Sequence, residues 1–372
     1  MKLSSQTITV LIISTITALI AGLFLLFFKS YLAIPGLIIL VPASMGVRGA
    51  IYGSLGAKLS SALHMGLIDN FSLQSKFLRE NMAKAFKINI FASFFLSIAI
   101  YGLTFANNIE VNPFFLIALS FLTGIISGGM ILFITYLIAL GSYYRGWDPD
   151  NVTVPIISSV GDILTIPILF ILSIFLIKSP IILLFIISII ALISSFYFLK
   201  SILGATFTII IIAILFDVVA GFLLDEYLEI LLFIPGILII IPVFLSQGGN
   251  IIGIFSSRLS TRLHLGLSTK IRNTFRDSIS VLFLGIITFS LIVLLAYFAC
   301  IFLSIPVSIE MLFKVSLIGG TSLLFISFFL AYSISIITFK YKIDPDDVTI
   351  PIMNSLIDFL GVLFLIIVVM LL

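Results

Sequence analysis

Two aspartates lie deep in apolar stretches, each at the end of a closely similar phrase. DPDNVTVPIISSVGD spans residues 148–162, and DPDDVTIPIMNSLID spans residues 344–358. The final residues, Asp162 and Asp358, stand about ten residues inside a predicted helix, or about 15 Å at the helical rise. That depth is half of a hydrocarbon core of about 30 Å. We therefore expect both carboxyl groups at the middle of a membrane.

Each phrase also predicts a polar helix face. Its first aspartate and proline are typical of a helix N-cap and first position. The internal proline frees a backbone carbonyl, which persists in a membrane only where protein or a water-filled cavity satisfies it. Helical spacing places six further residues on the two aspartate faces, and we predict that they line a path: Pro155, Ser158 and Ser159, and Pro351, Asn354 and Ser355.

Two facing carboxylates favour a divalent cation, because they repel each other unless a proton or a cation lies between them. Mg²⁺ sheds its waters reluctantly, so one or two carboxylates and retained waters suffice to hold it. The alternative is a structural role, in which the aspartates cap neighbouring helices or pair with Arg48. The pattern does not distinguish Mg²⁺ from Mn²⁺, Co²⁺ or Ca²⁺. Five more acids predict a cation-concentrating inner mouth: Asp148, Asp150, Asp344, Asp346 and Asp347.

The composition predicts an all-α polytopic membrane protein. The chain is 61% hydrophobic and only 9% charged, whereas soluble domains have about a quarter charged residues. Apolar runs of about 20 residues, the length that spans a bilayer, recur throughout. The expected partners are the lipid bilayer and divalent cations, and no nucleic acid. We predict eleven transmembrane helices, over residues 7–28, 32–62, 86–106, 113–142, 152–177, 180–199, 203–224, 231–262, 279–304, 312–339 and 350–372.

The sequence contains an internal repeat. Residues 34–67 match residues 234–267 without a gap, with prolines, glycines and histidines in register, and the two acidic phrases match as well. Each repeat holds five predicted helices, and one unmatched helix returns the chain to its starting side. The repeats are therefore expected to be parallel, related by a pseudo-two-fold axis along the membrane normal. The predicted units are residues 1–178, a linker helix at 179–200, and residues 201–372.

Basic residues predict the orientation, because they concentrate in cytoplasmic loops. Lys29, Lys178 and Lys314 fall on the outer side and Arg48 within a span, and the other fifteen of the 19 lysines and arginines fall on the inner side. We expect a multi-pass protein of the cell membrane with a cytoplasmic N-terminus and an external C-terminus. The segments 66–85 and 266–278 are predicted as inner connectors at the interface.

A second repeated motif contains glycines that permit close helix approach or exposed backbone. In the second repeat it reads Gly248-Gly249-Asn250, and Asn250 offers an amide to a cation or its waters. Arg48 stands where the second repeat has Gly248, so it either restrains cations or pairs with an acid. All four residues are predicted to line the path. The two histidines are predicted to lie at the interface, since they make a poor zinc site alone.

At these motifs the chain resembles the MgtE-type magnesium transporters, and more closely their eukaryotic solute-carrier relatives, in which two units are fused. PVFLSQGGNIIGIFSSRLSTRLHLG at 242–266 and both acidic phrases carry the resemblance. It implies a pore between two five-helix units, where Asp162 and Asp358 match the aspartate that binds hydrated Mg²⁺. A single chain would suffice as a pseudo-dimer. It leaves open a channel or an exchanger that couples Mg²⁺ to Na⁺, as the fused branch has been associated with exchange.

The pattern argues against two other functions. An intramembrane aspartyl protease uses two membrane aspartates, one normally in a Gly-x-Gly-Asp phrase. Here the aspartates follow Ser159-Val160-Gly161 and Ser355-Leu356-Ile357, so the pattern fails and no enzyme is expected. The paired aspartates also disfavour a scaffold or a lipid scramblase without ion specificity.

Overall fold

The computed structural model describes residues 5–65, 75–202, 204–266 and 271–371. Over these residues the chain is helical, and eleven helices are long and apolar enough to cross a membrane. The predicted all-α polytopic class is confirmed. The long helices are α1 (Ser5–Phe27), α2 (Leu37–His64), α3 (Lys76–Ala106), α4 (Pro113–Tyr144), α5 (Pro149–Leu176), α6 (Ile181–Ile202), α7 (Ala205–Glu226), α9 (Pro235–His264), α10 (Ile271–Phe302), α12 (Gly320–Lys340) and α13 (Pro345–Met370).

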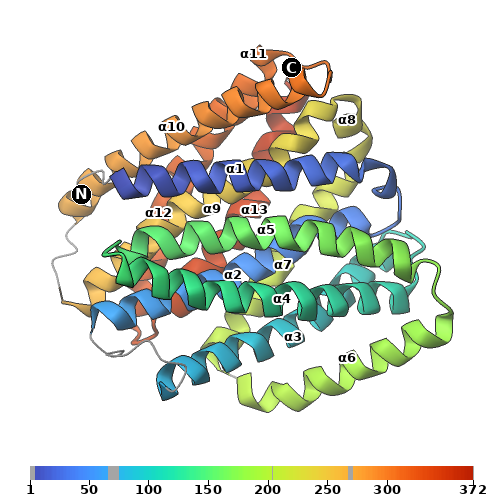
Figure 1. The fold of residues 1–372 in the computed structure, drawn as a ribbon, viewed down its shortest axis with the longest axis horizontal. Helices are drawn as coiled ribbons and strands as arrows, with labels where there is room; N and C mark the ends of the chain where they lie inside the picture. Colours follow the sequence, from blue (N-terminus) through green and yellow to red (C-terminus); the bar gives the residue numbers. More distant parts are fainter. Residues whose placement is uncertain (1–4, 66–74, 203, 267–270, 372) are drawn as a thin grey trace.

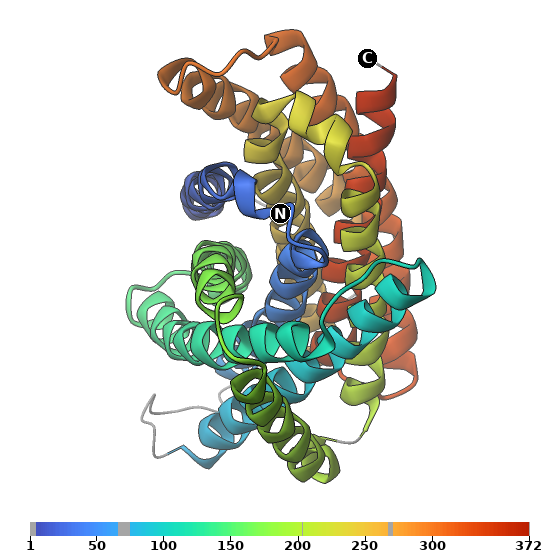
Figure 2. The same ribbon diagram turned by 90° about the vertical axis from the view of Figure 1, so that its right-hand side faces the viewer.

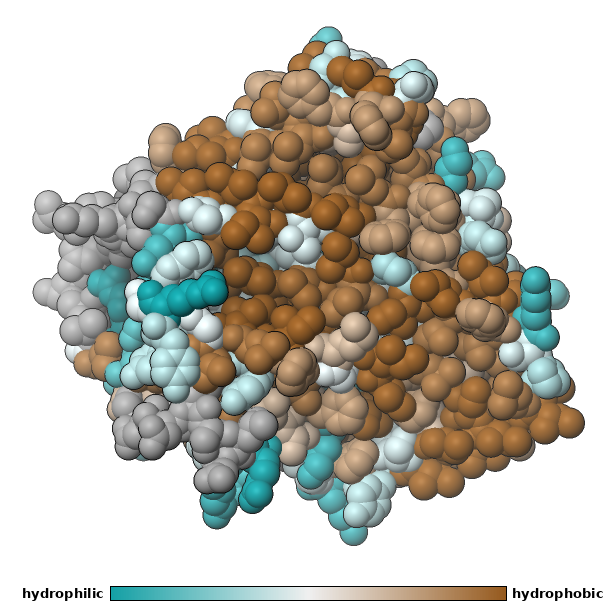
Figure 3. Space-filling view, in the orientation of Figure 1, coloured by the Kyte–Doolittle hydropathy of each residue, from teal (hydrophilic) through white to brown (hydrophobic). Residues whose placement is uncertain are grey.

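Short elements complete the described chain. They are a 3₁₀ turn (Lys29–Tyr31), α8 (Leu228–Phe233), α11 (Ile309–Phe313) and a π-helical stretch (Lys314–Gly319) that leads into α12. Most long helices lie side by side with their axes roughly aligned (Figure 1). Hydrophobic side chains cover the middle of the face in Figure 3, and hydrophilic ones gather toward its edges. This distribution is the one that a bilayer requires.

Helices α2 and α9 form the centre of the bundle. Their most apolar windows are 94% and 100% buried, against 22% for α6. Helix α6 packs only on the outside, against α3 and α4 (Figures 1 and 2). The unmatched helix is thus peripheral, whereas the repeated motif supplies the core.

The first helix of each repeat packs on the other repeat. Helix α1 lies against α9 and α10 as well as α5, and α7 lies against α2 and α3 as well as α13. Matching glycines make these contacts: a Cβ on Gly22 would collide with the carbonyl oxygen of Ile239, and one on Gly221 with that of Ile39. The missing side chains let the two backbones approach closely.

The acidic phrases begin helices as predicted. The carboxylate of Asp148 accepts a hydrogen bond from the N–H of Asp150, and that of Asp344 from the N–H of Asp346. Each aspartate is followed by a proline at the first helical position. These caps place both phrases at one end of the bundle, where α2 and α9 end. We call it the acidic end.

Several predicted boundaries were wrong. Helix α3 begins at Lys76, not at residue 86, so the later part of the predicted connector 66–85 is helical. Residues 66–74 lie outside the described ranges. The stretch after Lys76 contains good helix formers and buries Leu78, which extends the helix beyond its apolar run. Helix α10 likewise begins at Ile271, within the predicted connector 266–278, of which residues 267–270 lie outside the described ranges.

The predicted helix over residues 231–262 is divided. Helix α8 ends at Phe233 and α9 starts at Pro235, whose ring favours the first position of a new helix. Of the basic residues assigned to the inner side, Lys2 and Lys270 lie outside the residues that the structure describes.

Candidate cation site

The structure brings Asp162 and Asp358 to one cavity. The cavity lies between α2, α5, α9 and α13. Both carboxyl-bearing residues line its wall. Asp162 is only 4% exposed, and its Oδ2 is buried without a hydrogen-bond partner. The lining residues are Met45, Gly46, Gly49, Ser158, Asp162, Leu245, Ser246, Gly249, Asn354 and Asp358.

Only some of the predicted lining residues reach this cavity. Besides the two aspartates, Ser158, Gly249 and Asn354 line it. The hydroxyl of Ser159 donates to the carbonyl of Pro155 and accepts from the amide of Asn250. These side chains therefore bond to one another beside the cavity. The residues predicted to line the path but found outside the cavity wall are Pro155, Ser159, Pro351, Ser355, Asn250, Gly248 and Arg48.

Arg48 points to a different part of the molecule. It is buried on α2 beside Tyr52, and its Nη2 lies 3.7 Å from where a Cβ on Gly124 of α4 would be. Its Nη1 donates to the carbonyl of Ser44. Gly248, its counterpart, faces packed side chains, since a Cβ there would lie 2.9 Å from Ile357. The repeated motif thus presents Gly49 and Gly249 to the cavity, one residue later.

A third carboxylate adjoins the pair. The Oδ2 of Asp217 on α7 accepts a hydrogen bond of 2.9 Å from Ser355, and its Oδ1 is buried without a partner. A Cβ on Gly46 would lie 2.5 Å from Oδ1 of Asp217 and 2.6 Å from Oδ2 of Asp358. The two carboxylates therefore share the space that Gly46 leaves open.

Sequence reasoning did not assign Asp217 to the site. The available signal was an ionisable residue inside an apolar run, which usually marks a functional position. Gly22 and Gly221 make equivalent contacts in the two repeats, and at the same offset the position of Asp217 is held by Ala18 in the first repeat. The third carboxylate consequently breaks the symmetry of the site.

At the acidic end, two aspartates bridge the two repeats. The Oδ1 of Asp150 accepts hydrogen bonds from Ser60 of α2 and Ser257 of α9. The Oδ2 of Asp346 accepts from Ser61 of α2 at 2.7 Å. Asp150 and Asp346 are 4% and 1% exposed. Both were predicted at the inner mouth, and the serine hydroxyls hold them in buried hydrogen bonds between the repeats, which we call the polar constriction.

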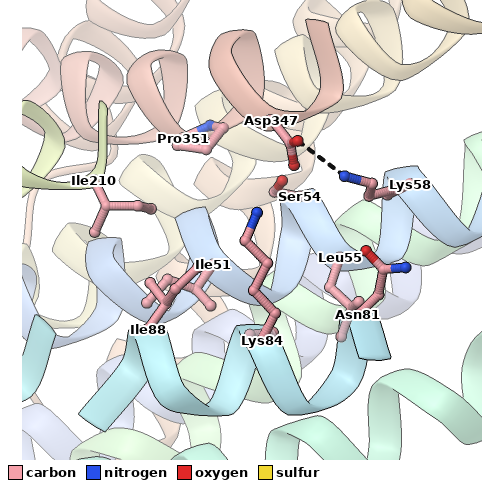
Figure 4. A pocket seen from close by; sticks show the side chains of 11 residues that line it. Ile51, Ser54, Leu55, Lys58, Asn81, Lys84, Ile88, Ile210, Asp347 and Pro351 are labelled. Atoms are coloured by element: carbon pink, nitrogen blue, oxygen red, sulfur yellow. Dashed lines mark hydrogen bonds and ion pairs between the residues drawn. The ribbon is translucent and has the colours of Figure 1, made fainter. Parts of the chain in front are cut away.

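The other three acids of the predicted mouth are half-buried. Asp347 forms an ion pair of 2.9 Å with Lys58 of α2. The pair lines a pocket into which Lys84 reaches from α3 (Figure 4). Asp344 lies 3.2 Å from His264 and 4.0 Å from Lys58. Basic residues thus neutralise part of the acidic end.

Asp148 is the N-cap residue that precedes the membrane-spanning part of α5. Burial disfavours its charged form, but the neighbouring imidazole of His64, the charge of Arg258 and the N–H of Asp150 together outweigh burial. The pKa of Asp148 therefore lies below its ordinary value, and the carboxylate is ionised at neutral pH.

The chain matches the MgtE family model, described as a divalent cation transporter, over residues 41–172 and 241–368. It is 27% identical to solute carrier family 41 member 2 of Xenopus laevis over 248 residues, 61% of this chain and 43% of that protein. It is 25% identical to member 3 of Mus musculus over 267 residues, 66% of this chain and 54% of that protein. The chain thus spans about half the length of these relatives.

A longer alignment joins the chain to solute carrier family 41 member 3 of Rattus norvegicus. The two are 24% identical over 362 residues, which are 87% of this chain and 77% of that protein. No solved structure matches. The two family segments fall one in each repeat, and a transporter family agrees with the prediction that the chain is not an enzyme. This chain belongs to the MgtE family of divalent cation transporters, with two MgtE units fused in one polypeptide.

Proposed function

We propose that the chain moves Mg²⁺ across the membrane along a path between its two repeats. Asp162 and Asp358 would bind the ion while it keeps most of its waters. The observation that carries the proposal is the meeting of these two repeat-related carboxylates at one cavity. The unpartnered Oδ2 of Asp162 supports it, because a buried carboxylate oxygen without a partner is costly unless a cation or water satisfies it.

The cavity wall suits a hard cation. Its polar groups are the carboxylates of Asp162 and Asp358, the amide of Asn354 and the hydroxyls of Ser158 and Ser246. Oxygen ligands favour Mg²⁺, Ca²⁺ or Mn²⁺ over softer metals. Mg²⁺ in particular binds through one or two carboxylates and retained waters.

The proposed organisation needs one chain. Residues 1–178 and 201–372 form the two five-helix units, and residues 179–200 form the linker helix. The first helix of each unit packs on the other unit, which supports a single chain that acts as a pseudo-dimer. We place the acidic end in the cytoplasm, where the predicted basic side lies, with the C-terminus outside.

Sodium-coupled exchange is the second candidate, and Asp217 favours it. Three carboxylates exceed the charge of one Mg²⁺, and the unmatched Asp217 offers a separate place for a monovalent cation. In this reading Na⁺ would be the coupling ion. A channel would need no such third acid.

The test is Mg²⁺ flux into liposomes that contain the purified chain and a Mg²⁺-sensitive dye. We expect flux above that of empty liposomes, first with an imposed Mg²⁺ gradient and then with a Na⁺ gradient. Flux that follows the Na⁺ gradient identifies an exchanger, and flux independent of Na⁺ identifies a channel. The proposal is rejected if liposomes with folded protein match empty ones in both arms.

Asp217→Asn is expected to raise the half-saturating Mg²⁺ concentration about tenfold, because it removes one nearby negative charge worth about 1.4 kcal/mol. In an exchanger it should also weaken the dependence on Na⁺. The measurement is liposome flux over a Mg²⁺ series. Asp225→Asn is the matched control, since Asp225 lies near the C-terminal end of α7 and is half-buried and away from the cavity. An unchanged half-saturating concentration in Asp217→Asn would remove this residue from the site.

Locking the constriction with a disulfide should slow transport. The Oγ of Ser61 and the Oγ1 of Thr261 are 3.3 Å apart across the two repeats, close enough for cysteines there to form a disulfide. We combine Ser61→Cys and Thr261→Cys in a Cys300→Ala background. Oxidation of this double-cysteine variant is expected to lower Mg²⁺ flux about tenfold, because the acidic end can no longer open. A reductant should restore the flux. The single-cysteine variants are controls, and full flux through quantitatively crosslinked protein would contradict the gate.

A further inference from the structure

Both histidines of the chain lie in matching clusters at the acidic end. His64 lies with Asp148 and Asp150, and His264 lies with Asp344 and Asp346. In each cluster one ligand atom from every residue lies within 4.8 Å of the others. No residue of either cluster lines the central cavity.

The distances in the first cluster suit a metal ion better than hydrogen bonds. The Nε2 of His64 lies 3.4 Å from Oδ1 of Asp148 and 3.6 Å from Oδ2 of Asp150. A good N–H···O hydrogen bond is about 2.9 Å long. Two ligands bound about 2.1 Å from a tetrahedral ion are about 3.4 Å apart. The two distances from the imidazole nitrogen are therefore close to the spacing of two ligands of one ion, and all three atoms lie within 4.8 Å of one another.

The second cluster contains a buried oxygen without a partner. The Nε2 of His264 lies 3.2 Å from Oδ1 of Asp344. Asp346 is 1% exposed, and its Oδ2 accepts from Ser61, but its Oδ1 has no hydrogen-bond partner. Leaving such an oxygen unsatisfied costs free energy, and the cost is greater for a charged group. A cation beside His264 and Asp344 would satisfy it.

We propose that each cluster binds one transition-metal ion of the Zn²⁺ class through one imidazole and two carboxylates, with water in the remaining position. Imidazole suits Zn²⁺, whereas Mg²⁺ requires octahedral oxygen ligands. The sites are thus distinct in chemistry and place from the central cavity.

The bound ions also have a mechanical consequence, which rests on the proposed transport function. An ion in the first cluster joins the end of α2 to the start of α5, and one in the second joins α9 to α13. It would hold Asp150 and Asp346 in the orientation in which their carboxylates accept hydrogen bonds from Ser257 and Ser61. Zn²⁺ at the acidic end therefore stabilises the closed constriction and inhibits Mg²⁺ flux.

Equilibrium dialysis of the purified full chain against Zn²⁺ tests the sites without any transport. We expect two Zn²⁺ per wild-type chain, one after His64→Ala or His264→Ala, and none after both. The double variant Asp162→Asn with Asp358→Asn should still bind two Zn²⁺ per chain, which would show that these ions are not bound in the central cavity. Cu²⁺ bound to the wild type should show imidazole nitrogen couplings by pulsed electron paramagnetic resonance. Equal Zn²⁺ binding by the wild type and the folded double-histidine variant overturns the proposal.

Liposome flux tests the regulatory role. Zn²⁺ at saturating concentration is expected to lower Mg²⁺ flux about tenfold in the wild type and to leave the double-histidine variant unaffected. Zn²⁺ binding without inhibition overturns the regulatory role. If the wild type moves no Mg²⁺ at all, the proposed transport function fails, while dialysis still decides whether the two sites exist.

Discussion

Replacing both cavity aspartates, Asp162→Asn with Asp358→Asn, is expected to lower Mg²⁺ flux more than about a hundredfold, or about 3 kcal/mol in ion binding. Asparagine keeps the size and one oxygen but removes both negative charges. Mg²⁺ that retains its waters is held mainly by charge, and the serine and asparagine groups of the cavity wall do not replace it. The measurement is liposome flux at Mg²⁺ concentrations below saturation.

The single variants refine this prediction. Each should lower flux about tenfold, because one carboxylate remains to hold the ion, and the double variant should lose at least the product of the two effects. The control is Asp225→Asn with Glu226→Gln, which removes two charges near the end of α7, away from the cavity. Loss of two buried like charges should not destabilise the fold, so thermal unfolding in detergent should be unchanged or shifted upward. Wild-type flux in the folded double variant would exclude the two aspartates as the ion site.

The pairing of Asp162 with Asp358 was predictable because the sequence indicates both their depth in the membrane and the symmetry of the two repeats. Depth follows from the count of helical residues after each capped start, and the matched phrases require equivalent places in two equivalent units. The structure places both residues at one cavity between the units. Local sequence was sufficient because each aspartate is fixed by its own helix.

The remaining parts of the site depend on neighbours that local sequence does not reveal. Asp217 reaches Asp358 because α7 crosses to pack on α2 of the other unit. Ser159 shares a helix face with Asp162, yet the amide of Asn250 takes its hydroxyl. Arg48 points toward α4, since α2 is buried on every side and offers several faces. Helical spacing predicts a face, but the packed partner decides which part of it reaches the cavity.

The histidine clusters illustrate the same limit over a longer distance. His64 and Asp148 are separated by two complete helices, α3 and α4, and meet only because α2 ends where α5 begins. The chemistry of one histidine alone is uninformative, and sequence reasoning left both histidines at the interface. Contacts of this kind follow from the topology of the five-helix unit, which is why they occur once in each repeat.

The exchange of first helices between the units yields the largest expected effect on stability. In Gly221→Ala, the new Cβ would collide with the carbonyl oxygen of Ile39. A backbone atom in the central helix cannot move aside as a flexible side chain can. Overpacking of this kind costs about 1–3 kcal/mol, and we expect the upper end of that range. The measurement is the midpoint of thermal unfolding in detergent, which should fall by several degrees.

Gly22→Ala should behave in the same way, because its Cβ would meet the carbonyl oxygen of Ile239 in the other unit. Gly102→Ala and Gly141→Ala are the matched controls, since a Cβ at either position meets nothing within 4 Å. In these helix interiors alanine should stabilise by about 0.5–1 kcal/mol. Opposite signs for the two pairs would mean that α1 and α7 are held by backbone contact with the opposite unit. That contact also brings Asp217 to the ion site, so a Gly221→Ala chain as stable as Gly102→Ala would remove the basis for a third carboxylate there.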